Sequence, residues 1–168
     1  MISKFPKASA SLLLVVLSFQ LSALAAVISC DNPDFGLSPY TWKRSCSGEA
    51  ARAEATMPGA YFKTLVNGTA NVGLSIDGTA NIGCPAPSMP SIEYSIDDGP
   101  FSVTQLSRTD ALYSLPIAQE LDAKAHHKVE VYFRSADLCQ KRWATSTAHL
   151  RIAGIVLDEG GALSAYPK

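Results

Sequence analysis

The sequence lacks the short motifs that carry hydrolytic, metal or phosphate chemistry. Neither Gly-x-Ser-x-Gly nor Gly-Asp-Ser, which present an activated serine in hydrolases, occurs in the chain. Ser75 follows Gly73-Leu74 inside a predicted strand and has no evident base. There is no Cys-x-x-Cys pair and no glycine-rich phosphate loop. The sequence therefore predicts no catalytic residue, no metal ligand and no cofactor.

The histidines and the paired acidic residues do not predict a metal site or a catalytic site either. His126 and His127 are adjacent at the start of a predicted strand, where neighbouring side chains point to opposite faces and cannot share one metal ion. The pairs Asp97-Asp98 and Asp158-Glu159 fall at predicted turns, where aspartate caps the backbone, rather than across a cleft as in a glycosidase. We interpret all of them as surface, edge or turn residues.

A basic field and a second long hydrophobic run are also missing. The 168 residues contain 14 Lys and Arg against 15 Asp and Glu. This balance excludes strong attraction to nucleic acid or to an anionic membrane surface. Because no further apolar run is long enough for a transmembrane helix, we expect neither nucleic acid nor membrane as a partner.

Residues 1–25 have the three parts of a secretory signal peptide. Lys4 and Lys7 precede the short apolar run 12–19, and Ala23-Leu24-Ala25 is a small-x-small cleavage site. Cleavage after Ala25 or Ala26 predicts a secreted protein, extracellular or periplasmic. A lipidated Cys30 is the weaker alternative, because the three preceding residues fit a lipobox poorly.

Four cysteines remain after the signal peptide: Cys30, Cys46, Cys84 and Cys139. An even number in a secreted chain predicts two disulfides, with three possible connectivities. We favour Cys30–Cys46 and Cys84–Cys139, which would hold the N-terminal loop and tie a long loop to a strand end. Asn67-Gly68-Thr69 is an N-glycosylation sequon that matters only in a eukaryotic source.

The clearest structural pattern is the stretch 128–134. Its β-branched and aromatic residues alternate, with Val129, Val131 and Phe133 on one side and charged residues or Tyr132 on the other. A period of two predicts a half-buried strand. Further strands are predicted at 49–57, 60–66, 70–76, 92–96, 101–105, 112–117 and 149–157.

Turn residues suggest how these strands connect. Asn67-Gly68 predicts a hairpin between 60–66 and 70–76, and Asp97-Asp98-Gly99-Pro100 predicts a second one between 92–96 and 101–105. In 149–157 the apolar parity slips near Gly154, which predicts a β-bulge whose dihedral glycine tolerates.

About eight short antiparallel strands without a convincing helix predict an all-β, jelly-roll-like β-sandwich. Strand spacing does not distinguish a jelly roll from an immunoglobulin-like topology, although the immunoglobulin Cys and Trp pattern is absent. We expect a signal peptide at 1–25, an irregular segment at 26–47, a β-sandwich module at 48–162 and a truncated linker or tail at 163–168.

Aromatic side chains are the remaining candidates for ligand binding. Trp42, Tyr132 and Trp143 are the predicted contacts for sugar rings, with Tyr40 and Tyr61 as possible neighbours. Flat rings stack on the C–H faces of sugars, but aromatic residues of β-sandwiches more commonly belong to the core or to an interface. Both interpretations remain open at the level of sequence.

The order of several segments resembles a known family. These segments are Pro58-Gly59-Ala60-Tyr61-Phe62, Gly73-Leu74-Ser75-Ile76-Asp77-Gly78-Thr79, Ile92-Glu93-Tyr94-Ser95-Ile96-Asp97-Asp98-Gly99-Pro100-Phe101, 127–134 and 150–161. Over roughly residues 40–165 the chain resembles the N-terminal β-sandwich module of two-domain SGNH-type esterases, the carbohydrate esterase family 2 group.

The resemblance implies a jelly roll followed by a catalytic domain that removes acetyl groups from polysaccharides. In that family the nucleophile lies in a Gly-Asp-Ser motif after the jelly roll, and none of the catalytic residues has a counterpart here. Three hypotheses follow: a secreted non-catalytic accessory module for docking or polysaccharide contact, the front part of an esterase whose SGNH domain is missing or on a separate chain, or a stand-alone lectin-like module.

Overall fold

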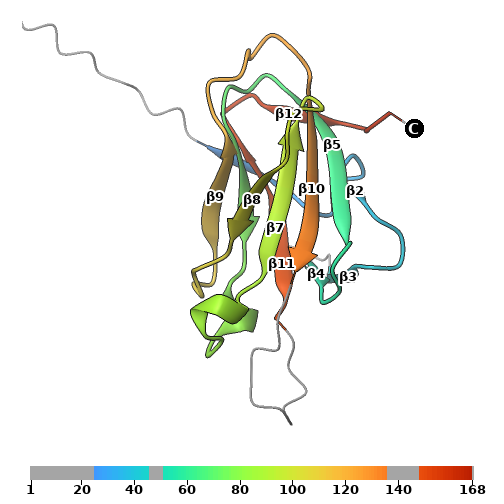
Figure 1. The fold of residues 1–168 in the computed structure, drawn as a ribbon. Helices are drawn as coiled ribbons and strands as arrows, with labels where there is room; N and C mark the ends of the chain where they lie inside the picture. The colour runs from blue at the N-terminus through green and yellow to red at the C-terminus, as the bar shows by residue number, and fades with distance from the viewer. Residues whose placement is uncertain (1–24, 46–50, 136–147, 168) are drawn as a thin grey trace, which may run out of the picture.

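The computed structural model describes residues 25–45, 51–135 and 148–167. Within these residues the chain forms two antiparallel sheets of six strands each, which pack face to face as a β-sandwich (Figure 1). No α-helix occurs in the described part of the chain, where two 3₁₀ turns, Thr79–Asn81 and Ala86–Ser88, interrupt one loop. The predicted all-β sandwich is confirmed.

Sheet A contains β3 (Lys43–Ser45), β4 (Arg52–Ala55), β11 (Leu150–Leu157), β6 (Val72–Ile76) and β9 (Tyr113–Ala118) in that order, with β1 (Ala26–Ser29) paired to β11. Sheet B contains β12 (Ala162–Ser164), β5 (Tyr61–Asn67), β10 (His127–Ser135), β7 (Ser91–Ile96) and β8 (Ser102–Gln105), with β2 (Gly36–Leu37) paired to β5. From β4 onward the chain crosses between the sheets at most connections. This crossing brings side chains from distant parts of the sequence onto one face.

Strand β10 occupies the centre of sheet B, between β5 and β7. Val129, Val131 and Phe133 face the core and are at most 1% exposed, while Lys128, Glu130 and Tyr132 point outward and are partly accessible. The alternation predicted for 128–134 is confirmed. The strand forms because β-branched and aromatic residues fit a pleated surface with one buried face.

The β-bulge predicted in β11 is also present. Ile152 pairs with Ile76, but Gly154 pairs with Ser75, so the register shifts by one residue between them. The shift keeps both Ile152 and Ile155 completely buried. The reason for glycine differs from the predicted one: a Cβ at position 154 would lie 2.1 Å from the backbone oxygen of Ile28, so the close approach of β1 requires a glycine there.

The β7–β8 hairpin is confirmed, and the predicted β5–β6 hairpin is wrong. Strands β7 and β8 pair with each other, and Asp97 and Asp98 between them adopt the positive φ angles of a type I′ turn. Strand β5 instead has both edges occupied, by β10 on one side and by β12 and β2 on the other. The chain therefore crosses after Asn67 to sheet A, where β6 pairs with β11 and β9.

The segment expected to be irregular, 26–47, contains β1, β2 and β3. Each is two to four residues long and has no alternating pattern of its own. They are strands because the edges of β11, β5 and β4 offer backbone partners. Strands this short are not detectable as a periodic sequence pattern. The prediction of about eight strands therefore did not include them.

Candidate functional site

Trp42 lies at the edge of the sandwich, where β3 begins and β5 starts. Its indole N–H donates to the backbone oxygen of Tyr61 at 3.0 Å and to the hydroxyl of Ser38 at 3.2 Å. The same serine hydroxyl accepts the Tyr61 N–H at 3.0 Å. The hydrogen bonds fix the indole, which packs against the core on one side and is half-buried.

Beside Trp42 the surface forms a hollow of about 310 Å³ that we call the aromatic hollow. It is lined by Tyr40, Thr41, Trp42, Lys43, Glu54, Thr56 and Met57. The Tyr40 side chain is fully exposed and its backbone has a φ of 66°, while Met57 is 64% exposed. Apolar faces, three hydroxyls, an ammonium and a carboxylate therefore surround one concave surface, a mixture typical of small-molecule sites.

A second hollow of about 300 Å³, the cationic hollow, adjoins the first. It is lined by Lys43, Ser45, Arg52, Glu54 and Arg151. Lys43 and Glu54 line both hollows, so the two form neighbouring parts of one surface. The strand register explains this convergence: Glu54 on β4 is paired with Lys43 on β3 and with Arg151 on β11.

Glu54 is held by His149 and Arg151, one on each carboxylate oxygen. One carboxylate oxygen lies 2.5 Å from His149 Nδ1 and the other accepts from Arg151 Nε at 2.5 Å. Burial would raise the pKa of Glu54, but the hydrogen bonds from Arg151 and His149 outweigh it and lower the pKa below its ordinary value. The carboxylate is therefore ionised, and both of its oxygens are already engaged.

Arg52, the other arginine of the cationic hollow, is paired in a similar way. Its Nε lies 3.2 Å from a carboxylate oxygen of Asp77. Burial raises the pKa of Asp77, yet the hydrogen bonds from Thr79 and Arg52 lower it overall. These pairs hold the outer face of sheet A in a defined charged arrangement.

Tyr132 lies on the outer face of sheet B, in contact with other aromatic rings. Its ring centroid is 5.5 Å from that of Tyr61 and 5.7 Å from that of Phe101. Its hydroxyl donates to Glu130 at 3.2 Å. Through Tyr61, which contacts Trp42 by its backbone and Tyr132 by its ring, the structure connects two of the three predicted binding residues.

Next to Tyr132, three tyrosine rings surround one lysine. The Lys63 ammonium lies 5.3 Å from the ring centre of Tyr61, 5.4 Å from that of Tyr132 and 5.6 Å from that of Tyr166, and it pairs with Glu130 at 3.0 Å. The Tyr166 hydroxyl donates to Glu130 at 2.6 Å, which raises the pKa of Tyr166 to about 12. Because the rings already pack on an internal cation, this cluster stiffens the sheet more than it offers an open stacking surface.

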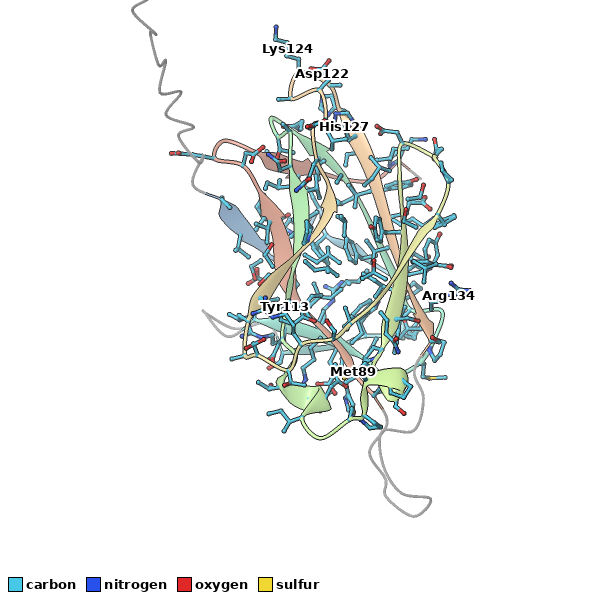
Figure 2. The ribbon with its side chains drawn as sticks, turned by 60° about the vertical axis from the view of Figure 1, so that its left-hand side comes forward. Met89, Tyr113, Asp122, Lys124, His127 and Arg134 are labelled. Carbon is cyan, nitrogen blue, oxygen red and sulfur yellow. The ribbon has the colours of Figure 1, made fainter. Side chains whose placement is uncertain are left out.

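His127 lies at the end of the sandwich where the β9–β10 loop turns. It lies beside Asp122, far from Met89 at the other end (Figure 2). The ring is 7% exposed, and its nitrogens lie 2.7 Å from Asp97 Oδ2 and 2.9 Å from the backbone oxygen of Asp122. In the described residues no group of three His, Cys, Asp or Glu side chains has the geometry of a metal site.

The remaining predicted residues have varied positions. Trp143, Cys46 and Cys139 lie outside the described residues. Cys30 is fully buried and Cys84 is disulfide-bonded. Because their predicted partners lie outside the described residues, the pairings Cys30–Cys46 and Cys84–Cys139 stay predictions. Asn67 ends β5, and its side chain donates to the Ser164 hydroxyl at 3.3 Å. Its glycosylation is untested.

Sequence reasoning missed the charged residues that line the cationic hollow. Arg52 and Glu54 share the outward parity of the predicted strand 49–57, and that parity was the one available signal. Lys43 and Arg151 join them only through strand pairing, which the sequence does not reveal.

Across the described part of the chain, no helix has the length and hydrophobicity needed to cross a membrane.

The site and the fold together define a β-sandwich module with a polar and aromatic edge surface. No protein-family model matches the sequence, and no curated protein matches it. Solved structures do match the fold. A family 2 carbohydrate esterase from Cellvibrio japonicus superimposes with a TM-score of 0.58 and 16% identity, over 86% of this chain and 36% of the esterase.

Two further esterases give the same result. An acetyl xylan esterase from the rumen bacterium Butyrivibrio proteoclasticus matches with a TM-score of 0.57 and 14% identity, over 87% of this chain and 34% of its own. A two-domain esterase active on acetylated mannans, co-crystallised with mannopentaose, matches with a TM-score of 0.56 and 11% identity, over 86% and 38%. The chain thus spans about a third of these esterases and resembles their N-terminal β-sandwich module.

Proposed function

We propose that the chain is a secreted, non-catalytic accessory module that contacts polysaccharide through the aromatic hollow. The observation that carries the proposal is the combination of the exposed Tyr40 ring, the fixed Trp42 indole and the hydrogen-bonding groups of Lys43 and Thr56 around one concave surface. Sugars are bound in this way, with ring faces against C–H groups and polar side chains at the hydroxyls.

The fold likeness supports the same class of ligand. The matched esterases include one active on acetylated mannans and one that is an acetyl xylan esterase. A β-sandwich in such a protein would serve by holding the polysaccharide near a catalytic domain. The proposed ligand is therefore an acetylated plant-type polysaccharide of the xylan or mannan class, and secretion places the module where such polymers occur.

Binding of the purified chain to acetylated xylan and mannan tests the proposal directly. The variant Tyr40→Asn removes the exposed ring but keeps a residue that tolerates positive φ. We expect its affinity to fall about fivefold, because one aromatic contact contributes on the order of 1 kcal/mol. Isothermal titration calorimetry or affinity electrophoresis measures the change.

Leu112→Ala is the matched control, since Leu112 is 51% exposed but lies in the loop before β9 and not in the hollow. It should bind like the unmodified protein. Absence of binding to both polymers, or equal loss of affinity in the two variants, would contradict the proposal.

Docking against a catalytic domain of the SGNH type is the second candidate function. Phe101 and Val103 at the β8 edge of sheet B are 52% and 50% exposed, and Phe101 contacts the Tyr132 ring. Adjacent exposed apolar side chains are typical of a surface that another domain covers. Co-elution with such a domain, abolished by replacing both residues with serine, would support docking, and unchanged separate elution would exclude it.

A further inference from the structure

We infer that the cationic hollow binds the carboxylate of an acidic sugar residue, so that the preferred ligand is a polysaccharide carrying uronic acid groups. This inference rests on the proposed function, since it assigns a substrate class to the surface that includes the aromatic hollow. It starts from the three cationic side chains of the hollow: Lys43, Arg52 and Arg151.

Lys43 supplies the charge that is still available to a ligand. Its side chain is exposed at the junction of the two hollows. Among the described residues no carboxylate lies within ion-pair distance of its ammonium, whereas Lys63 and Lys128 have acidic partners. An ammonium on a concave surface with no internal partner is suited to an anionic ligand group.

Arg151 supplies directed hydrogen bonds. Its Nε donates to Glu54, and the described residues provide no acceptor for its two terminal nitrogens. The contact with Glu54 fixes the orientation of the guanidinium plane, so its remaining N–H groups are already positioned. Guanidinium N–H groups bind carboxylates with well-defined geometry, and Ser45 adds a hydroxyl on the same surface.

Glu54, the carboxylate among the described residues that line the hollow, does not oppose an anion. Glu54 is engaged on one oxygen by His149 and on the other by Arg151. The second acid nearby, Asp77, is paired with Arg52. Among the described residues around the hollow, three permanent cations therefore stand against two compensated carboxylates.

The shared lining explains why the ligand should be a substituted sugar and not a free anion. A sugar ring on Tyr40 and Trp42 lies within the same continuous surface as Lys43 and Glu54, which also line the cationic hollow. A carboxylate attached to that ring, or to its neighbour along the polymer, reaches Lys43, Ser45 and Arg151. The two hollows thus have complementary roles for one ligand.

The test compares xylan that carries glucuronic acid groups with neutral arabinoxylan, at about 20 mM and about 300 mM salt, where the screening length differs several-fold. We expect the acidic xylan to bind about tenfold more tightly at low salt, and the difference to shrink at high salt. Lys43→Met should remove most of this preference while keeping the aliphatic stem.

Lys124→Met is the matched control. Lys124 is an exposed lysine on the β9–β10 loop, at the end of the sandwich remote from β3 (Figures 1 and 2). This variant should keep the preference for acidic xylan and its salt dependence. Equal affinity for the two xylans, or a preference that Lys43→Met leaves intact, would overturn the inference.

The outcomes separate the two proposals. Binding of both xylans without preference, lost in Tyr40→Asn, would remove the uronate inference and leave the proposed function. A preference that depends on Lys43 but not on Tyr40 would support the cationic hollow and contradict the aromatic one. Absence of binding to either xylan would overturn both.

Discussion

At the scale of single residues, His127 joins two loops at one end of the sandwich. Its ring lies between the Asp97 carboxylate of the β7–β8 turn and the backbone oxygen of Asp122 in the β9–β10 loop. Both partners accept hydrogen bonds, so a ring that satisfies both must donate from both nitrogens and carry a positive charge. The hydrogen bond to Asp97, followed by that to Asp122, raises the pKa of His127 above its ordinary value.

This arrangement predicts that the contribution of His127 to the stability of the protein declines as pH rises. Because the pKa of His127 is raised by folding, its contribution is complete below the unfolded value of about 6.5 and is lost as pH rises through the folded pKa. The variant His127→Gln should be about 1–3 kcal/mol less stable at pH 5.5, as expected for hydrogen bonds to a charged group. Urea unfolding between pH 5 and 9 measures the difference.

The difference in the free energy of unfolding between His127→Gln and the unmodified protein should become smaller above pH 6.5. His126→Gln, at the adjacent exposed position, is the control and should be as stable as the unmodified protein at every pH. Parallel curves for His127→Gln and the unmodified protein over the whole range would show that the histidine is not charged in the folded state.

Which single residues matter for the candidate site was only partly predictable. Trp42 was predicted because aromatic residues are recognisable in any sequence, and the structure does place it in a hollow. Lys43 and Arg151 were not, because their proximity depends on β3 and β11 both lying in sheet A beside β4. Residue type is visible in a sequence, whereas lateral strand order is not.

At the scale of elements, Asp158 connects the crossing from sheet B to sheet A with the end of β11. Its Oδ2 accepts from the backbone N–H groups of Ala70 at 2.8 Å and Asn71 at 3.0 Å, and its own N–H donates to the Thr69 hydroxyl at 3.0 Å. Burial raises the pKa of Asp158, but the hydrogen bonds from Asn71 and Ala70 lower it overall.

Removing this carboxylate should destabilise the protein. Asp158→Ala leaves two backbone donors without their partner, and we expect a loss of about 1–3 kcal/mol at pH 7. Since folding lowers the pKa of Asp158, its contribution is complete above the unfolded value of about 3.9 and is lost as pH falls from there through the folded pKa. The two proteins should therefore become similar at low pH in guanidinium titrations.

Glu159→Ala is the control for this element, because Glu159 is the exposed neighbour and should change the free energy of unfolding by less than about 0.5 kcal/mol. Equal effects of the two substitutions would mean that Asp158 acts through general charge and not through its contacts with the crossing.

The positions of strands and turns were predicted better than the pairing of the strands. The Asp97-Asp98-Gly99 turn correctly predicted the β7–β8 hairpin, since the strand on each side has a free edge toward the other. Asn67-Gly68 correctly marks a change of direction, with Gly68 at a φ of 68°, but the strand beyond it crosses to the other sheet. A turn motif specifies a local reversal and contains no information about which edge is already occupied.

At the scale of the whole molecule, the two sheets share one hydrophobic core. The cluster of buried residues includes Phe62 and Phe133 from sheet B together with Leu74 and Ile152 from sheet A. Neither sheet has another described layer to cover its inner face. This arrangement predicts that the two sheets unfold together.

Leu74→Ala tests this cooperativity, since Leu74 is completely buried in the core. We expect the free energy of unfolding to fall by about 2–5 kcal/mol, because the leucine side chain no longer contributes its transfer energy and leaves a cavity. Far-UV and near-UV circular dichroism under non-reducing conditions should report a single transition that moves to lower denaturant in both signals. Two separated transitions would show that the sheets are independent folding units.

The fold class was predictable at this scale and the path of the chain was not. Short alternating strands such as 128–134, with Gly, Pro and Asp turns between them, leave a β-sandwich as the compact solution. The choice between jelly-roll and immunoglobulin-like connections depends on which sheet each strand joins. Those contacts are long-range, as between Leu150 on β11 and Ala55 on β4.

Strand β4 and the residue on each side of it combine two tasks: Ala51, Ala53 and Ala55 line the core, and Arg52, Glu54 and Thr56 face the hollows. Under the proposed function, mutations at the second set would change what the surface recognises, whereas the first set preserves the sandwich. During evolution, ligand preference in such a module can therefore diversify by single substitutions without loss of foldability. For the protein engineer, the same three outward positions, with Lys43 beside them, form a compact library for retargeting the module to new polymers.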